Sequence, residues 1–297
     1  MVQRPTEARH PASDGLHALP VDQAMARLLD AQAAALQAVR PAMAGIAAAA
    51  QAGAASLQSG GKMAYAGAGS SGLMALADCL ELAGTFGIPP ASTPMLFAGG
   101  TDALLHMTGG VEDDPALAQA DFDRAGLSAG DTILCLSASG TTPYTLVLVD
   151  LAKARGVTVV GMANVPGAPL LAQADIAILL DTGPEVVSGS TRMGAGTAQK
   201  VALNILSVLV GIHIGAVHDG YMVNVIADNA KLIDRAARIV AAISGRDLTD
   251  AHDALSHTGG AVKPAILVAA GASVAQAEVA LRDAGGHLGP ALASLKT

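Results

Sequence analysis

The sequence predicts an α/β protein with a doubly wound, mainly parallel five-stranded sheet, preceded by N-terminal helices and followed by a small helical subdomain. The first observation is a length of 297 residues with 52% hydrophobic residues, which is enough for a sizeable buried core. The second is a series of five short apolar runs that end in small or polar residues and alternate with helix-like segments. We expect three segments, which are residues 1–58, 59–220 and 221–297.

The elements are expected in the following order. Residues 21–58 are rich in Ala, Leu, Met and Gln with a break near Pro41, which predicts two helices or one kinked helix. The strands are expected within residues 62–69, 93–100, 132–139, 157–164 and 175–181. From residue 197 to about 243 the pattern is helical again, with a turn at 217–222 and an exit at Gly245. The last part, 246–297, has the short amphipathic stretches of a small helical bundle.

Composition argues against several classes of partner. An aromatic content of 2% and a net charge of −8 leave no stacking platform and no basic stripe for nucleic acid. Cys79 and Cys135 lie in apolar contexts that predict buried thiols, not a disulfide framework or metal cluster. The N-terminus lacks the apolar core of a signal peptide, and we find no uninterrupted run of about 18 apolar residues. We therefore expect a soluble cytoplasmic protein without a membrane partner.

Two hydroxyl-rich loops follow predicted strands. The loops are "GAGSSG" (67–72) and "SASGTT" (137–142), and each precedes a helix-like segment. Backbone N–H and side-chain O–H groups at such strand ends can converge on one anion. The competing interpretation is that Ser139 or Thr142 only caps a helix. Because no Walker lysine and no ribose-binding acid accompany these loops, a sugar phosphate fits better than a nucleotide.

Acidic residues and one arginine are further candidates. Glu112 in "GGVEDD" would by default be part of a solvated acidic turn or helix start, and Glu81 would lie on an exposed helix face. Glu185 is expected to contact substrate hydroxyls or to cap a helix. Arg192 is expected either to bind a substrate carboxylate or to pair with an acid. The histidines show no metal-ligand spacing, so no metal is expected.

Six motifs resemble those of one known family. "TEARHPAS" (6–13), "GTFGIPP" (84–90), "GGVEDD" (109–114), "SASGTTPY" (137–144), "GPEVVSGSTRMGAGTAQK" (183–200) and "NAKLIDRAARIV" (229–240) together resemble the N-acetylmuramic acid 6-phosphate etherases. That resemblance implies a sugar isomerase (SIS) domain that binds a phosphosugar.

The reaction that the resemblance implies starts on the ring-opened sugar. The C2 proton is removed, the C3 ether leaves as D-lactate, and water adds back to give N-acetylglucosamine 6-phosphate, with no metal or redox cofactor. The implied catalytic residues are Glu112 as the base and Glu81 as the acid. The expected substrate-binding residues are Ser70, Ser71, Gly72, Ser137, Ser139, Gly140, Thr142, Glu185, Ser190 and Arg192.

The spacing of Glu81 has a consequence for assembly. If one helix runs from Ser71 to Glu81, ten residues separate the two ends by roughly 15 Å, which is too far for one small sugar. Either that helix breaks early or Glu81 serves the site of a neighbouring subunit. We expect a homodimer with shared active sites.

The chain also departs from the pattern of the etherases. Leu73, Thr141 and Gly194 stand where those enzymes usually carry basic residues. Two alternatives therefore stay open, which are an SIS-type isomerase of another amino-sugar phosphate and a non-catalytic phosphosugar sensor.

Overall fold

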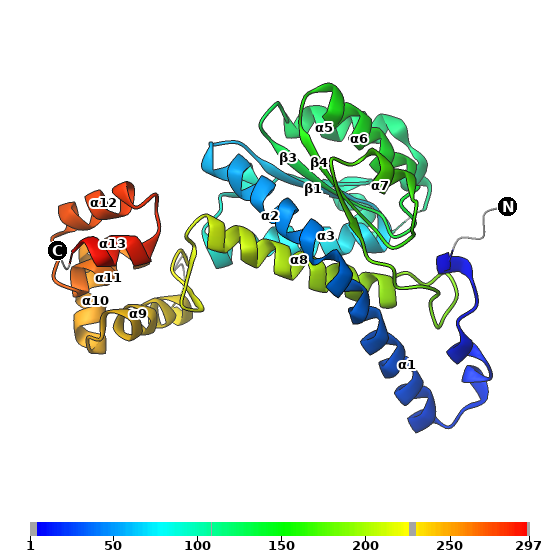
Figure 1. The fold of residues 1–297 in the computed structure, drawn as a ribbon, viewed down its shortest axis with the longest axis horizontal. Coiled ribbons are helices and arrows are strands. Elements are labelled where there is room, and N and C mark those ends of the chain that lie inside the picture. Colours follow the sequence, from blue (N-terminus) through cyan, green and yellow to red (C-terminus); the bar gives the residue numbers. More distant parts are fainter. Residues whose placement is uncertain (1–4, 108, 226–229, 296–297) are drawn as a thin grey trace. The chain divides into compact units, whose positions relative to one another are not determined.

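A computed structural model describes residues 5–107, 109–225 and 230–295 and confirms the α/β class (Figure 1). The chain divides into two compact units: Met1–Leu80 with Ala91–Ser207, and Glu81–Pro90 with Val208–Thr297. The first unit holds the sheet and the second holds the C-terminal helices. The division at 58/59 and 220/221 stays a prediction. Residues 1–4, 226–229 and 296–297 of its outer segments lie outside the described residues, and so does Asn229 of the quoted 229–240 motif.

All five predicted strands are present in one parallel sheet. They are β1 (Met63–Gly67), β2 (Met95–Phe97), β3 (Thr132–Leu136), β4 (Thr158–Ala163) and β5 (Ile176–Leu179). The strand order is β2-β1-β3-β4-β5, so the chain reverses its winding direction between β1 and β3. At such a reversal the loops after the two strands diverge and leave a crevice. The crevice here is bounded by the two hydroxyl-rich loops.

Helices cover both faces of the sheet. One layer contains α5 (Pro115–Ala125), α6 (Pro143–Ala154) and α7 (Pro169–Gln173), and the opposite layer contains α2 (Met43–Gln58), α3 (Gly69–Phe86) and α8 (Gly194–His213) (Figure 1). Alternate strand residues point to opposite faces. Ile133 and Val159, for example, pack against Phe122 and Leu148 of the α5–α7 layer.

The N-terminal helices confirm the expected break at Pro41. The helix α1 (Val21–Ala35) passes into a 3₁₀ segment, η4 (Leu36–Ala42), before α2 begins. Proline has no N–H and its ring crowds the carbonyl four residues earlier, so an α-helical bond cannot form there. The tighter 3₁₀ turn is the local result.

The second unit contains the predicted helical bundle. A two-stranded hairpin, β6 (Val217–His218) and β7 (Tyr221–Met222), turns through Asp219 and Gly220, which both have positive φ. The helices are α9 (Ala230–Ser244), α10 (Leu248–His257), α11 (Val262–Ala269), α12 (Val274–Asp283) and α13 (Leu288–Ser294). Small alanines and aliphatic residues of α9 to α13 share one core.

Two further elements complete the sheet unit near the crevice. The short helix α4 (Gly100–Leu105) and the 3₁₀ turn η6 (Gly109–Asp113) lie between β2 and α5 in the chain.

Two helical stretches, Val21–Gln58 and Gly194–His213, are long and apolar enough to cross a membrane. In the structure, 33% and 56% of their most apolar 18-residue windows are buried. Contacts of α2 with β1, β3 and β5 account for part of this apolar character as sheet packing.

Candidate functional site

The crevice between β1 and β3 is a polar hollow of about 320 Å³. Its floor comes from the residues that follow β1 and β3, and its walls come from η6, the N-terminal arm and the 183–193 loop. The lining residues are Thr6, Glu7, Ala68, Gly69, Ser70, Ser71, Met107, Glu112, Ser137, Ala138, Ser139, Thr142, Gly189 and Thr191. Six of the predicted site residues are among them, which are Glu112, Ser70, Ser71, Ser137, Ser139 and Thr142.

Ser71 is fixed in the first turn of α3. Its side chain is buried, and its hydroxyl oxygen accepts hydrogen bonds from the backbone N–H of Ala138 and from Nε2 of Gln199, each at 3.1 Å. The first of these bonds joins the loop after β1 to the loop after β3. Ser70, the preceding residue, is half-buried and also faces the crevice.

The 137–142 loop is held by its own hydroxyl groups. Ser137 Oγ lies 2.8 Å from Thr142 Oγ1 and accepts a hydrogen bond from the Gly140 N–H at 3.0 Å. Ser139 Oγ accepts from the N–H and the hydroxyl of Thr141. Thr142 occupies the N-cap position of α6, yet its hydroxyl makes no capping hydrogen bond. The capping alternative is therefore wrong for the Thr142 hydroxyl, which faces the crevice beside Ser137.

The two predicted glycines have backbone roles. Gly140 has φ of +65° within the 137–142 loop. Gly72 lies in α3, where a Cβ atom would be 2.8 Å from the ring of Phe97 and 2.9 Å from the carbonyl carbon of Gly67. The missing side chain lets α3 start directly against β1. Neither glycine lines the hollow among the described residues, so a substrate contact for either stays a prediction.

Glu112 projects from η6 to the start of α3. Its carboxylate lies so close to Gly69 that a Cβ atom at that position would be 2.5 Å from Oε1. Burial, and to a smaller extent the charge of Asp113, raises the pKa of Glu112 above the usual carboxyl value. Glu112 also lines a second hollow of about 160 Å³, together with Phe97, Ala103 and Val111. Glu112 thus lines two hollows, and the second of them has a larger share of apolar residues in its lining.

Glu81 has a different setting. Its side chain is exposed, and it lies on α3, which is unbroken from Gly69 to Phe86. The alternative of an early helix break is therefore wrong. Within the described part of the chain, the Glu81 side chain makes no hydrogen bond or ion pair.

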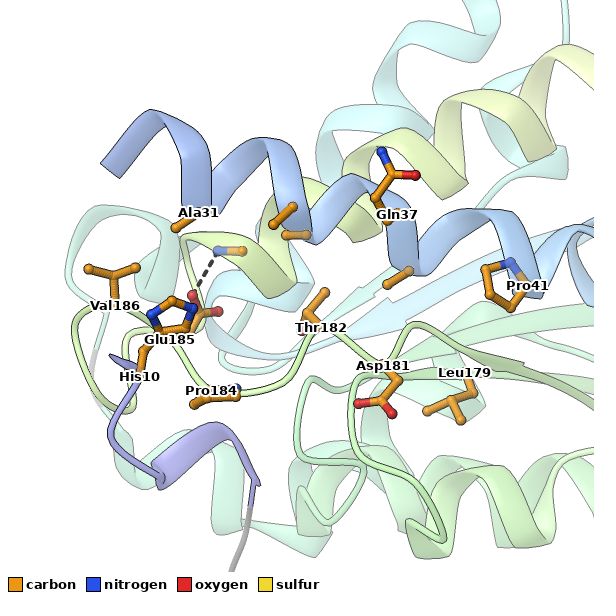
Figure 2. A pocket seen from close by; sticks show the side chains of 14 residues that line it. His10, Ala31, Gln37, Pro41, Leu179, Asp181, Thr182, Pro184, Glu185 and Val186 are labelled. Carbon is orange, nitrogen blue, oxygen red and sulfur yellow. Dashed lines mark hydrogen bonds between the residues drawn. The ribbon is translucent and has the colours of Figure 1, made fainter. Parts of the chain in front are cut away.

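Glu185 lines a separate hollow of about 520 Å³, whose other walls are the end of α1, η4, His10 and the segment after β5. Figure 2 shows its carboxylate joined by a dashed line to the start of α8, and His10 lies beside it. Its two oxygens accept from the N–H groups of Gly194 and Ala195, both at 2.8 Å. Of the two roles expected for Glu185, the structure displays helix capping, and a substrate contact stays a prediction.

The remaining predicted residues lie on the 183–193 loop. Arg192 is exposed and Ser190 is half-buried, and the crevice is lined by their neighbours Gly189 and Thr191. No ion pair of Arg192 is found within the described residues, so binding of a substrate carboxylate stays a prediction.

Sequence reasoning missed residues from three places. Thr6 and Glu7 reach the crevice because the arm is bound to the 183–193 loop: Gly189 N–H donates to the Thr6 carbonyl and the Ser188 hydroxyl donates to the Glu7 carbonyl. Asn164 and Gln199 lie buried behind Ser71. The signals were present, since "TEARHPAS" and "GTAQK" stand out as motifs and Asn164 ends an apolar run.

The crevice therefore brings neutral hydroxyl donors together with the Glu112 carboxylate, whose pKa is raised by burial. Such an arrangement suits binding of a phosphate monoester and proton removal from a carbon acid. In the part of the chain that the structure describes, no group of three or more His, Cys, Asp or Glu side chains is placed to hold a metal ion.

Comparison with known proteins identifies the family. Residues 28–164 match the SIS domain family. The chain is 44% identical to an N-acetylmuramic acid 6-phosphate etherase of Deinococcus radiodurans, over 96% of this chain and 93% of that protein. The chain is also 41% identical to an N-acetylmuramic acid 6-phosphate etherase of Streptomyces coelicolor, over 97% of this chain and 93% of that protein. A phosphoheptose isomerase structure from Neisseria gonorrhoeae covers 65% of this chain and 97% of its own at 18% identity and a TM-score of 0.48. At this identity and coverage of the two etherases, the chain belongs to the N-acetylmuramic acid 6-phosphate etherase family.

Proposed function

We propose that this protein is a carbon–oxygen lyase that converts N-acetylmuramic acid 6-phosphate to N-acetylglucosamine 6-phosphate and D-lactate. The observation that carries the proposal is the Glu112 carboxylate, which is half-buried and lines the same crevice as the hydroxyl groups of the two loops. Membership of the etherase family supports the choice of reaction. The isomerase and sensor alternatives are not favoured, because the relatives matched over nearly the full chain are named etherases.

The phosphate group binds among the donors at the ends of β1 and β3. Ser71, Ser137, Ser139 and Thr142 supply hydroxyl groups, and Ser70 lies at the start of α3, where the helix dipole favours an anion. Neutral donors hold the phosphate without polarising its ester bond, which suits a reaction that leaves the phosphate intact. Holding the phosphate fixes the sugar relative to Glu112.

Glu112 is the general base. In the ring-opened sugar, its carboxylate removes the proton from C2, which lies next to the aldehyde, and the electron pair of that C–H bond forms the C2–C3 double bond as the C3–oxygen bond breaks. Glu81 donates a proton to the departing lactate oxygen. Water then adds to C3 and returns a proton to C2, so atoms and charge balance without a change of oxidation state overall. Two carboxyl groups in different environments can divide the two roles, and here Glu112 is half-buried in the crevice while Glu81 is exposed on α3.

The active unit is proposed to be a homodimer with shared sites. Because α3 is unbroken, Glu81 lies ten residues beyond Ser71 on the same helix, and this spacing favours a role for Glu81 in the active site of a second copy of the chain. An exposed apolar stripe on α1, formed by Val21 (75% exposed), Met25 (64%) and Leu29 (70%) at four-residue spacing, supports association through this helix. A cytoplasmic setting suits two free, buried cysteines and a phosphorylated sugar substrate.

The test is release of D-lactate from N-acetylmuramic acid 6-phosphate by purified protein without added metal or nucleotide. We expect release from the unmodified protein and none from Glu112→Gln or Glu81→Gln. Glu278→Gln, which changes an exposed carboxyl of α12, is the matched control and should keep full activity. Absence of release from the unmodified protein, with N-acetylglucosamine 6-phosphate still bound, would contradict the proposal.

A further inference from the structure

A chain of buried amides lies behind the phosphate-binding crevice. Asn164, which follows the end of β4, is 0% exposed, and Gln199 of α8 is 1% exposed. Asn164 donates from Nδ2 to the carbonyl of Leu180 at 3.0 Å, and Gln199 donates from Nε2 to Asn164 Oδ1 at 3.0 Å and to Ser71 Oγ at 3.1 Å. The chain therefore runs from the end of β5 to a hydroxyl that lines the crevice.

The direction of these hydrogen bonds is set at one end. A backbone carbonyl can only accept, so the Leu180 carbonyl requires the NH₂ group of Asn164 to face it. The oxygen of the same amide then faces Gln199, which must present its own NH₂ group. The reversed orientation of Gln199 would place two carbonyl oxygens against each other in a buried position, and such unmatched polar groups are costly.

This order of hydrogen bonds determines whether the Ser71 hydroxyl can donate or accept. A hydroxyl oxygen has two lone pairs and one hydrogen. Both lone pairs of Ser71 are used, one by the N–H of Ala138 and the other by Gln199. Its hydrogen is left to donate, and Ser71 lines the crevice.

We propose that Gln199, set by Asn164, is a positioning residue that makes Ser71 a hydrogen-bond donor only. The crevice then selects ligand groups that accept hydrogen bonds, as the oxygens of a phosphate monoester dianion do, over groups that donate. Ser137 differs, because the bond between its hydroxyl and that of Thr142 can run in either direction. The inference rests on the proposed function only for the identity of the ligand, a phosphosugar.

The test is a double-mutant cycle on the full-length protein, with N-acetylglucosamine 6-phosphate as the probe and calorimetry as the readout. Ser71→Ala and Gln199→Met should each weaken binding by roughly tenfold, as expected for loss of a hydrogen bond to a charged group. In the Ser71→Ala background, Gln199→Met should weaken binding by less than about twofold, because Gln199 acts through Ser71. Two losses that multiply, or unchanged binding in Gln199→Met, would overturn the inference.

A second variant guards against a packing defect caused by methionine. Gln199→Glu keeps the side-chain shape. At a pH above the raised pKa of a carboxyl in this buried position, the new side chain is ionised, accepts a hydrogen bond from Ser71 and turns its hydrogen away from the crevice, so binding measured at that pH should again weaken. Unchanged affinity in this variant would contradict the inference.

A matched control lies on the same helix. Ser207→Ala removes a buried hydroxyl bond to Asp78, and it should lower Tm while leaving the affinity for the probe unchanged. A comparable loss of affinity in Ser207→Ala would show that the Gln199 effect is only structural.

The inference and the proposed function fail in different ways. Lactate release by the unmodified protein is measured on the same preparation. If no lactate is released but Ser71 and Gln199 remain coupled in binding, the lyase assignment falls and the positioning role stands. If lactate is released and the coupling is absent, the positioning role falls alone.

Discussion

Glu112, the proposed general base, is the residue whose environment most directly affects the proposed reaction. Its raised pKa, caused first by burial and then by Asp113, means that the carboxyl holds its proton to a higher pH than an ordinary glutamate. A general base works only when ionised. The rate of C2 proton exchange should therefore fall as the pH drops through a value above the ordinary carboxyl pKa of about 4.3.

The same shift predicts a pH dependence of stability. The folded state binds the Glu112 proton more tightly than the unfolded chain does, so the stabilisation from this group is fully present below the unfolded pKa and is lost as the pH rises through the folded pKa. At neutral pH, Glu112→Gln should raise Tm while it abolishes exchange. Calorimetric melting at several pH values, with Glu278→Gln for comparison, checks this. For the exchange reaction, a pH–rate profile whose acid limb lies at the ordinary carboxyl pKa would contradict a raised pKa of Glu112.

Gly69 lies against the Glu112 carboxylate, so the position of the proposed base depends on this glycine as well. Its φ is +53°, a conformation that other residues rarely adopt, and a Cβ atom there would collide with Glu112 Oε1. Gly69→Ala should therefore reduce kcat at least about tenfold, since a displaced catalytic group loses its alignment, and should cost about 1 kcal/mol of stability.

Gly60→Ala is the control for the backbone strain alone. Gly60 also has a positive φ of +81°, but no atom lies within 4 Å of its Cβ position. This variant should lose stability and keep kcat. If both variants keep kcat, the close contact of Gly69 with Glu112 is irrelevant to the reaction.

At the scale of elements, the beginning of α8 depends on Glu185. The carboxylate is 4% exposed and accepts two of the N–H groups that a helix start leaves without intrahelical partners. Glu185→Ala should lower the free energy of unfolding by about 1–2 kcal/mol. If capping is its function, KM for the sugar phosphate should change little.

Thermal unfolding and steady-state kinetics separate the two roles that were expected for Glu185. Asp247→Ala, at the exposed start of α10, removes one capping bond and serves as the comparison. A large rise in KM with an unchanged Tm would instead favour a direct substrate contact for Glu185.

At the scale of the whole molecule, the proposed shared sites predict subunit complementation. Glu81→Gln and Glu112→Gln proteins should each be inactive. When the two are unfolded and refolded together, a mixed dimer combines Glu112 of one chain with Glu81 of the other in one intact site, so lactate release should return. The same mixture of Glu112→Gln with a Glu81→Gln/Glu112→Gln double variant is the control and should stay inactive. Lack of recovery in confirmed mixed dimers would mean that each site uses both carboxyl groups of one chain.

Much of the architecture could be predicted because its determinants are local. The five apolar runs became β1 to β5, Pro41 produced the 3₁₀ segment, and Gly245 follows the end of α9 with a positive φ. The two hydroxyl loops were expected at one edge because parallel strands place their carboxyl ends together. Periodicity and turn chemistry act over a few residues, so the sequence shows them directly.

The site could be predicted only in part. Ser71 and Ser137 were found from their loops, whereas the amides that hold Ser71 were missed because Gln199 is 128 positions away in the chain. Thr142 looked like a helix cap and makes no capping bond with its side chain. No local pattern says which direction such a hydroxyl takes once neighbouring helices are packed.

By itself, the sequence determined the α/β class, the strands and their loops, and through its motifs the family. Only the tertiary structure decided that Glu112 lies against Gly69, that Glu185 caps α8, and that Gln199 and Asn164 order the hydrogen bonds behind Ser71. The physical reason is the distance along the chain over which each kind of interaction acts. Backbone conformation and apolar periodicity are set by near neighbours, while the partner and direction of each polar group depend on which distant segments packing brings into contact.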